Sequence, residues 1–424
     1  MTSQEVSNVF RWYFNFSQVG AISQARVDNQ KSFRLLWIMI YVIGWILTLY
    51  QVVRLIQRIQ KYEVQTNISE EIKKELRFPA ITFCNNNKVH CKHLSTLISE
   101  CGLTNCTRKS LYCELLVGTK CRKDNNLCKG VNEDTWNFTT LEQVEPKMVI
   151  SPFELAYLKL TADEMQKVAH QPQDLFMRCQ FNENDRNALC MHLMQKGGTA
   201  LFSSGHGVCY SFNLREFFPS SLKDFIKQKE SQNIDIFPDN SNDLRQFYPG
   251  PYFGLDLMLN LETDFHIGRG NGFLSPKGLT ISIHESDTLP DFELDSLWLQ
   301  PGFQYDIKLA ATQMEKLEPP YTSKCRDSYP KECPYPGKYA SSLCSYACYL
   351  NRFLGACNCT PARYINGLPE DIYKSKTFCL SNPEQGICFS QLLNHLITSD
   401  AQNETYEDIC TPQCKRTKFR VSIW

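Results

Sequence analysis

The sequence has no excess of charge of either sign. Its 45 lysine and arginine residues are balanced by 45 aspartate and glutamate residues. This balance removes the electrostatic argument for nucleic acid, or for any strongly charged surface, as a partner. The chain also contains no low-complexity segment and no repeat of fixed period, so we exclude a repeat array.

Enzyme signatures are missing as well. The glycine-rich segment Ser204-Gly205-His206-Gly207 lacks the Gly-Lys-Ser/Thr ending of a phosphate-binding loop. No Gly-x-Ser-x-Gly nucleophile motif and no His-Glu-x-x-His zinc motif occurs in the chain. We therefore expect a protein that is not an enzyme and that has no cofactor.

Metal-binding spacings are scarce too. Thiolate zinc sites commonly use Cys-x-x-Cys pairs, and this spacing occurs nowhere in the chain. The histidines of His90-Cys91-Lys92-His93 resemble a metal cluster, but we expect Cys91 in a disulfide, which leaves too few ligands. We predict no metal site. Isolated His284, at the end of an apolar strand pattern, is expected to be a structural histidine rather than a pH-sensitive contact.

One long apolar run is present near the start of the chain. It covers 19 uncharged residues, 35–53, between Arg34 and Arg54. As a helix rising about 1.5 Å per residue it would measure roughly 28 Å, close to the hydrocarbon thickness of a bilayer. The run begins too late and is too long for a typical signal peptide. We predict a transmembrane helix, with a buried helix of a large soluble protein as the alternative.

All 20 cysteines follow this run, and the first is Cys84. An even number of cysteines on one side of a membrane span indicates disulfides made in the secretory pathway. The N-x-S/T glycosylation sequons beyond the run begin at Asn67, Asn105, Asn137, Asn358 and Asn403. We therefore place residues 1–34 in the cytosol and residues 54–424 outside the cell.

Local patterns predict both strands and helices in the external part. Apolar or alternating runs predict strands at 78–83, 209–212, 253–261 and 279–284. Capping signals predict helix starts at Ser151 and Thr161, and we expect further helices at 339–354 and 389–397. The six cysteines between Cys91 and Cys128 lie in a stretch with little apolar periodicity. We expect disulfides to hold that stretch, in any of about 15 pairings.

Several motifs, taken in order, resemble those of the degenerin and epithelial sodium channel family, which includes acid-sensing and peptide-gated sodium channels. The motifs are FPAITFCN at 78–85, CYSFN at 209–213, LTISIHESDTLP at 279–290, QPGFQ at 300–304, PPY at 319–321, Cys325, YASSLCSYAC at 339–348 and ACNC at 356–359. The resemblance extends from about residue 16 to the last residue.

The resemblance implies a membrane α+β fold. One N-terminal transmembrane helix would precede a large, disulfide-rich, hand-like ectodomain with a palm β-sheet, a finger at 88–178, a β-ball and a helical thumb at 325–414. It also implies a plasma-membrane location, assembly into a homo- or hetero-trimer with family subunits, and sodium as the conducted ion.

Disulfide pairs follow from the same resemblance. The implied pairs are Cys84–Cys209, Cys179–Cys190, Cys325–Cys414, Cys344–Cys410, Cys357–Cys388 and Cys359–Cys379. Asp408 stands where the family has a cysteine two residues before Cys410, so Cys348 lacks its usual partner. Cys333 is our candidate for that role.

Tyr62 and Tyr321 match the aromatic pair at the family's wrist, where thumb movement is transmitted to the membrane helices, with plain packing as the alternative. Gly20 matches the glycine of the family's cytosolic His-Gly gating motif, whose histidine is replaced here by Val19. Glu63 and Val64 stand where acid-sensing members have adjacent histidines, so proton gating is not expected.

These implications predict a subunit of a ligand-gated, amiloride-sensitive-type sodium channel whose extracellular ligand, a peptide or another molecule, binds at finger and thumb. The family's second membrane helix carries the selectivity filter, and no second apolar run of bilayer length is present in the sequence. We therefore expect a truncated chain that does not conduct alone. The alternative is a single-pass, type II binding or regulatory protein with the same ectodomain.

Overall fold

The computed structural model describes residues 8, 31–62, 64–71, 76–104, 106–119, 121, 128, 152–181, 199–203, 205–214, 245–246, 253–265, 276–361, 366–369, 378–379, 383–400 and 409–423. These residues form two compact units. The first comprises residues 1–69 and 319–324, and the second comprises residues 70–318 and 325–424. Together they combine one apolar N-terminal helix with a mixed helix and sheet region that contains many disulfides.

The first unit is built on helix α3, Lys31–Gln60. Its large apolar side chains face outward along its length, with Ile46 and Leu47 exposed by 60% and 57%. A soluble helix exposes polar groups on its outer face, whereas a lipid-facing helix is apolar all round. Residues 34–60 are long and apolar enough to cross a membrane, and no other helix in the described residues is. The alternative of a buried soluble helix does not fit these exposed side chains.

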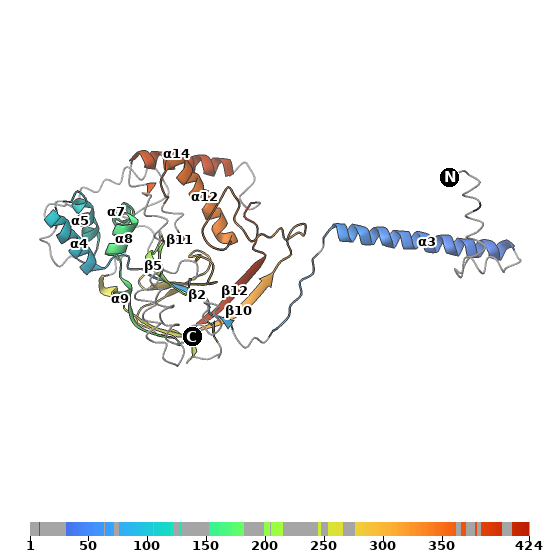
Figure 1. The fold of residues 1–424 in the computed structure, drawn as a ribbon, viewed down its shortest axis with the longest axis horizontal. Coiled ribbons are helices and arrows are strands. Elements are labelled where there is room, and N and C mark those ends of the chain that lie inside the picture. The colour runs from blue at the N-terminus through green and yellow to red at the C-terminus, as the bar shows by residue number, and fades with distance from the viewer. Residues whose placement is uncertain are drawn as a thin grey trace, which may run out of the picture. The chain divides into compact units, whose positions relative to one another are not determined.

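The second unit contains a six-stranded antiparallel sheet (Figure 1). In spatial order its strands are β11 (Asn366–Pro369), β4 (Thr199–Ser203), β5 (Gly207–Phe212), β2 (Ala80–Asn85), β8 (Leu279–His284) and β9 (Ser296–Leu299). Every residue of the neighbouring strands β5, β2 and β8 is buried. Their apolar residues follow partly continuous and partly alternating patterns, which is why these three strands were visible in the sequence.

Three polar side chains inside this sheet contact one another. Thr82 Oγ1 lies 3.0 Å from Ser211 Oγ and 2.9 Å from His284 Nε2. These contacts join the three central strands. Because an unpaired buried polar group is costly, they also favour this strand register over a slipped one.

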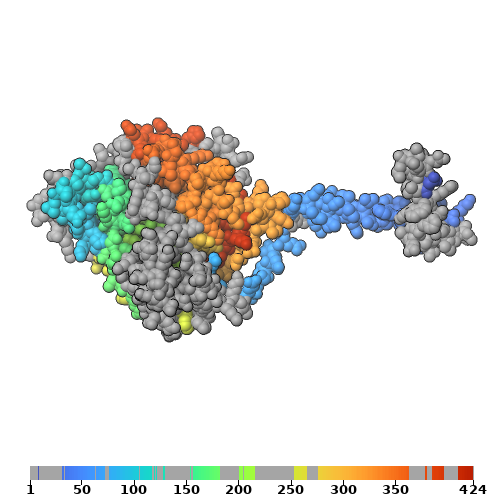
Figure 2. All heavy atoms as spheres, viewed as in Figure 1, coloured from blue at the N-terminus to red at the C-terminus, as the bar shows by residue number. Residues whose placement is uncertain are grey.

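Five short helices pack together in the same unit. They are α4 (Cys91–Thr104), α5 (Lys109–Gly118), α7 (Pro152–Leu158), α8 (Ala162–Val168) and α9 (Pro172–Leu175). Figure 2 shows the turquoise residues of α4 and α5 beside the green residues of α7 to α9 on one part of the surface. Helix α7 begins at Pro152, as the capping signal predicted, although Ser151 itself lies outside the described residues.

Helices α4 and α5 correct the expectation that disulfides alone shape residues 91–128. Leu94, Ile98 and Cys101 bury one face of α4 at helical spacing. The periodicity was missed because Cys101 was counted as a cross-link and not as an apolar side chain. The cross-links are Cys91–Cys121, Cys101–Cys106 and Cys113–Cys128.

Two longer helices follow, α12 (Ser341–Cys357) and α14 (Pro383–Asp400), which contact each other (Figure 1). Leu343, Ala347 and Leu350 form the buried face of α12. The helix ends at Asn358, whose φ of 50° gives the left-handed cap that Asn tolerates. Phe353 packs against Phe389 of α14, with ring centroids 5.0 Å apart.

Three two-stranded antiparallel ribbons complete the described secondary structure, apart from a short 3-10 turn at Thr263–Phe265. The longest pairs β10 (Ile307–Glu315) with β12 (Lys415–Ile423) from Ile307 opposite Ile423 to Glu315 opposite Lys415. The others pair β3 (Phe176–Phe181) with β7 (Leu255–Leu259) and β1 (Leu76–Arg77) with β6 (Arg245–Gln246). The ribbon of β10 and β12 extends outward from the sheet region in Figure 1.

Helix α8 starts with the capping box predicted at Thr161. The Glu164 backbone N–H donates to Thr161 Oγ1, and the Glu164 carboxylate accepts from Thr161 N at 2.8 Å. The same carboxylate accepts from Arg108 Nη2 and from the Tyr112 hydroxyl, both at 2.6 Å. Burial works to raise the pKa of Glu164, but the hydrogen bonds from Arg108, Tyr112 and Thr161 outweigh it, and the pKa falls below its ordinary value. Glu164 therefore joins α5 and α8 as a charged hub.

We expect Glu164→Ala to lower the free energy of unfolding by about 2 kcal/mol, which is below the roughly 3–5 kcal/mol of a fully buried ion pair because Arg108 keeps partial access to water. Asp163→Ala is the matched control: Asp163 pairs with Lys167 on the exposed face of the same helix, and its loss should cost less than about 0.5 kcal/mol. Chemical denaturation of the two variants measures the difference. Equal losses would show that Glu164 is not a hub.

Candidate functional site

The first site residue, Tyr62, stands at the end of α3. Its backbone N–H donates to the carbonyl of Ile59 at 3.1 Å. Its φ of 48° lies in the left-handed region, which a bulky side chain rarely adopts. Such conformations persist where the surroundings hold them, and they concentrate at functional sites. The backbone just after helix α3 therefore has a defined conformation, which sets the direction of the Tyr62 ring.

The ring of Tyr62 meets that of Tyr321 within the same unit. The ring centroids are 5.6 Å apart and the planes lie at 77°, an edge-to-face contact. Tyr321 belongs to the turn at residues 319–324, where its carbonyl accepts from Lys324 N at 3.1 Å. Tyr62 is 41% exposed, so this is a surface contact and not part of a hydrophobic core. It joins the C-terminal end of α3 to the segment that separates β10 from α12.

The disulfides of the described residues include Cys84–Cys209, Cys325–Cys414, Cys344–Cys410, Cys357–Cys388 and Cys359–Cys379. These are pairs that the family resemblance implies. Cys333 bonds Cys348, with 4.4 Å between their Cα atoms. The extra cysteine is therefore the partner of Cys348, in place of the family cysteine that is replaced by Asp408. Cys179 is also disulfide-bonded, and its predicted partner Cys190 lies outside the described residues.

Other predicted site residues are only partly visible. Gly20, Asn105, Asn137 and Asn403 lie outside the described residues. Asn67 and Asn358 are exposed, as attachment of a glycan requires. Glycosylation at the five sequons stays a prediction.

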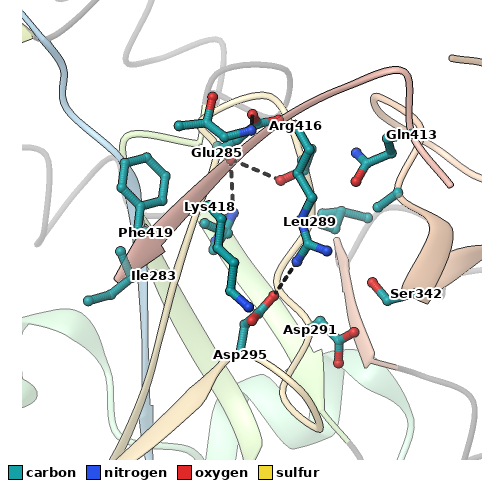
Figure 3. A pocket seen from close by; sticks show the side chains of 14 residues that line it. Ile283, Glu285, Leu289, Asp291, Asp295, Ser342, Gln413, Arg416, Lys418 and Phe419 are labelled. Carbon is teal, nitrogen blue, oxygen red and sulfur yellow. Dashed lines mark hydrogen bonds and ion pairs between the residues drawn. The ribbon is translucent and has the colours of Figure 1, made fainter. Parts of the chain in front are cut away.

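A small polar cavity lies where β8, the 285–295 loop, α12 and β12 meet (Figure 3). Its volume is about 50 Å³, enough for a few water molecules, whereas sites for small organic ligands measure roughly 300–1,000 Å³. Figure 3 shows Arg416 reaching from β12 toward Asp295, and the two side chains are 3.1 Å apart. The cavity is a charged junction between elements, too small to hold an organic ligand.

Glu285 is the hub of this junction. Its carboxylate accepts hydrogen bonds from Lys338 Nζ, at 3.0 Å, and from the backbone N–H of Thr417. Lys338 Nζ also lies 3.4 Å from Asp287. Burial works to lower the pKa of Lys338, but the hydrogen bond to Glu285 and the charges of Glu285 and Asp287 raise it overall. The residues just before α12 are thereby tied to the ends of β8 and β12. The sequence could not reveal this hub, because its members are far apart in the chain.

His284 has the structural role expected of it. Its Nε2 lies 2.9 Å from Thr82 Oγ1 and its Nδ1 lies 3.0 Å from the Glu285 carbonyl oxygen. Complete burial lowers its pKa to about 4. The ring is therefore neutral at physiological pH and does not sense pH near neutrality.

Comparison with known proteins identifies a family and several relatives to which the sequence of this chain is similar. A family model described as amiloride-sensitive sodium channel matches residues 13–424. The chain is 22% identical to the epithelial sodium channel subunit beta of Canis lupus familiaris over 299 residues, 68% of this chain and 39% of the relative. It is 23% identical to acid-sensing ion channel 1C of Danio rerio over 358 residues, 84% of this chain and 56% of the relative. The chain spans about half the length of these curated relatives.

Proposed function

Because the chain belongs to the amiloride-sensitive sodium channel family, we propose that it is a subunit of a ligand-gated sodium channel in the plasma membrane. Its relatives are ion channels and not enzymes. We propose that the subunit joins a homo- or hetero-trimer with other family members. Its extracellular ligand would be a peptide or another molecule.

The proposed topology follows the predicted one. Residues 1–34 lie in the cytosol, residues 35–53 cross the membrane and residues 54–424 lie outside. The disulfides beyond α3 support the external location, because such bonds form and persist in oxidising compartments. In this proposal the six-stranded sheet belongs to the palm, residues 88–178 form the finger and residues 325–414 form the thumb.

The contact between Tyr62 and Tyr321 carries the proposal for gating. Tyr321 lies four residues before Cys325, the start of the proposed thumb, and its ring meets the residue that ends α3. A thumb movement that displaces the 319–324 turn would act on the end of the membrane helix through this pair. Edge-to-face aromatic pairs contribute about 0.5–1.5 kcal/mol beyond burial, enough to bias an equilibrium between closed and open states.

Recording sodium current from cells that express the chain tests this proposal. Expressed alone, the 424 residues should give no amiloride-sensitive current, because a pore needs more than one membrane helix and the described residues hold one candidate. Expressed with a full-length epithelial sodium channel subunit, the chain should co-purify with it from the cell surface and change its current. Robust current from the chain alone would refute the proposed lack of conduction, and the absence of any association would refute the subunit role.

A second candidate function is that of a single-pass type II binding or regulatory protein, which the candidate span in α3 would anchor. In this alternative the ectodomain binds a ligand without conducting ions. Stable delivery to the surface, with no association with any family subunit, would favour it. Suppression of a partner's current by an associated chain would combine the two functions.

A further inference from the structure

Three segments that are distant in the sequence bring acidic and imidazole side chains together in the second unit. His90 lies between β2 and α4, His170 lies between α8 and α9, and Glu262 lies between β7 and the turn at Thr263–Phe265. His90 Nε2 is 3.0 Å from Glu262 Oε1. One ligand atom from each of the three residues lies within 4.8 Å of the other two.

Two groups of this cluster lack partners. His170 is only 3% exposed, and among the described residues neither of its ring nitrogens makes a hydrogen bond of good geometry, the Val89 backbone interacting with the ring only weakly. Glu262 Oε2 is likewise buried without a partner in the described part of the chain. A buried polar atom left unpaired costs about 1–3 kcal/mol, so native proteins usually satisfy such atoms with protein, water or an ion.

The backbone holds the cluster in an unusual conformation. Glu262 has a φ of 45°, in the left-handed region that a glutamate seldom adopts. Its N–H donates to Asn260 Oδ1 at 3.3 Å, and its carbonyl accepts from Asn87 Nδ2 at 3.4 Å. The carbonyl of His170 accepts from the Tyr210 hydroxyl at 2.9 Å. These bonds fix the two residues whose side chains lack partners.

A second acidic and imidazole pair lies against the first. His93 Nε2 is 3.3 Å from Asp174 Oδ2, and His93 Nδ1 donates to the Ala169 carbonyl at 2.9 Å. The His93 and His90 ring centroids are 4.1 Å apart. His93 and Asp174 therefore pair with each other at the border of the cluster.

We propose that His90, His170 and Glu262 bind a divalent transition metal of the zinc type, with His93 and Asp174 beside the site. Neutral imidazole nitrogen and carboxylate oxygen suit Zn²⁺, whereas Ca²⁺ and Mg²⁺ prefer oxygen ligands alone. Ligands about 2.0–2.2 Å from a tetrahedral zinc lie roughly 3.4 Å apart. The 3.0 Å between His90 Nε2 and Glu262 Oε1 would widen slightly, and the other ligand atoms, which lie within 4.8 Å of one another, would move closer.

This site revises the expectation of no metal. That expectation considered only the ligands near His90 in sequence, and Cys91 is indeed occupied, in its bond to Cys121. The missing ligands come from His170 and Glu262, which the fold supplies. His90 Nδ1 now accepts a long bond of 3.4 Å from His93 N. Coordination through Nε2 would move the ring proton to Nδ1 and release that bond.

The test is zinc binding to the purified full chain in detergent after removal of metal with EDTA. Isothermal titration with ZnCl₂ should show one site, weakened at least tenfold by His170→Ala and by Glu262→Gln. His395→Gln is the matched control, because it removes an exposed histidine of α14 and should leave binding unchanged. Zinc K-edge absorption should show nitrogen and oxygen neighbours at about 2.0–2.2 Å and no sulfur near 2.3 Å.

Several outcomes would overturn the proposal: no binding to the wild-type chain, unchanged binding in Glu262→Gln, a sulfur neighbour in the absorption spectrum, or displacement of zinc by millimolar Ca²⁺. If His170→Ala fails to fold, Glu262→Gln and His90→Gln decide, because glutamine approximates the size and polarity of the side chains it replaces. None of these measurements depends on channel function, so they test the metal site independently of the proposed function.

Discussion

Replacing both Cys84 and Cys209 by alanine is expected to lower the free energy of unfolding by about 4 kcal/mol, and this is the largest effect that we expect from any single cross-link. The two residues face each other across β2 and β5 and are fully buried. Their bond closes a loop with a sequence separation of 125. Loop-closure entropy alone gives about 5 kcal/mol for such a loop, and the disulfides inside it reduce that value.

The matched control is replacement of Cys101 and Cys106 by alanine, because this bond closes a loop with a sequence separation of only five. The same entropic relation gives about 2 kcal/mol for it. Chemical denaturation under non-reducing conditions, followed by intrinsic fluorescence, compares the two variants. Equal losses, or a larger loss for the short loop, would contradict the role assigned to the central cross-link.

Acidification from pH 7.5 to pH 5 is expected to destabilise the second unit by about 6 kcal/mol, roughly 2 kcal/mol for each of three buried histidines, His170, His206 and His284. Burial lowers the pKa of His170 from 6.5 to about 3. Burial lowers the pKa of His284 from 6.5 to about 4. Burial, with a smaller contribution from the charge of Lys88, lowers the pKa of His206 from 6.5 to about 4. Between pH 6.5 and pH 4 the unfolded chain binds protons at these positions and the folded chain does not, so stability falls as pH falls.

Unfolding midpoints measured at several pH values in the presence of EDTA test this expectation. His284→Gln should remove about a third of the pH dependence, and His395→Gln, which alters an exposed histidine, should leave it intact. Stability that does not change between pH 7.5 and pH 5 would contradict the burial of the three imidazoles.

Local signals in the sequence predicted the parts of the fold that local physics determines. The strands β2, β5 and β8 were visible because their apolar residues follow continuous or alternating patterns typical of strands. The start of α8 was visible because a capping box places both of its partners within four residues. Helices α4 and α5 were missed because their cysteines serve both as cross-links and as apolar packing residues.

The site residues also divide into those that could be identified from the sequence and those that only the tertiary structure brings together. Tyr62 and Tyr321 were singled out by family resemblance, since nothing in the local sequence relates them. Lys338, which pairs with Glu285, and His170, which meets His90, were not found because these contacts join residues that only the tertiary fold brings together. No local pattern encodes contacts of this kind.

The central claim is that the Tyr62 and Tyr321 rings couple the ectodomain to the membrane helix. Single-channel recording tests it on chains co-expressed with a full-length family subunit, comparing wild type, Tyr62→Ala, Tyr321→Ala and the double variant. We predict a coupling energy of about 0.5–1.5 kcal/mol, a change of about 2- to 13-fold in the opening equilibrium, and retention of coupling in the Tyr→Phe variants because the contact uses the rings. Additive effects of the two alanine substitutions would contradict the claim.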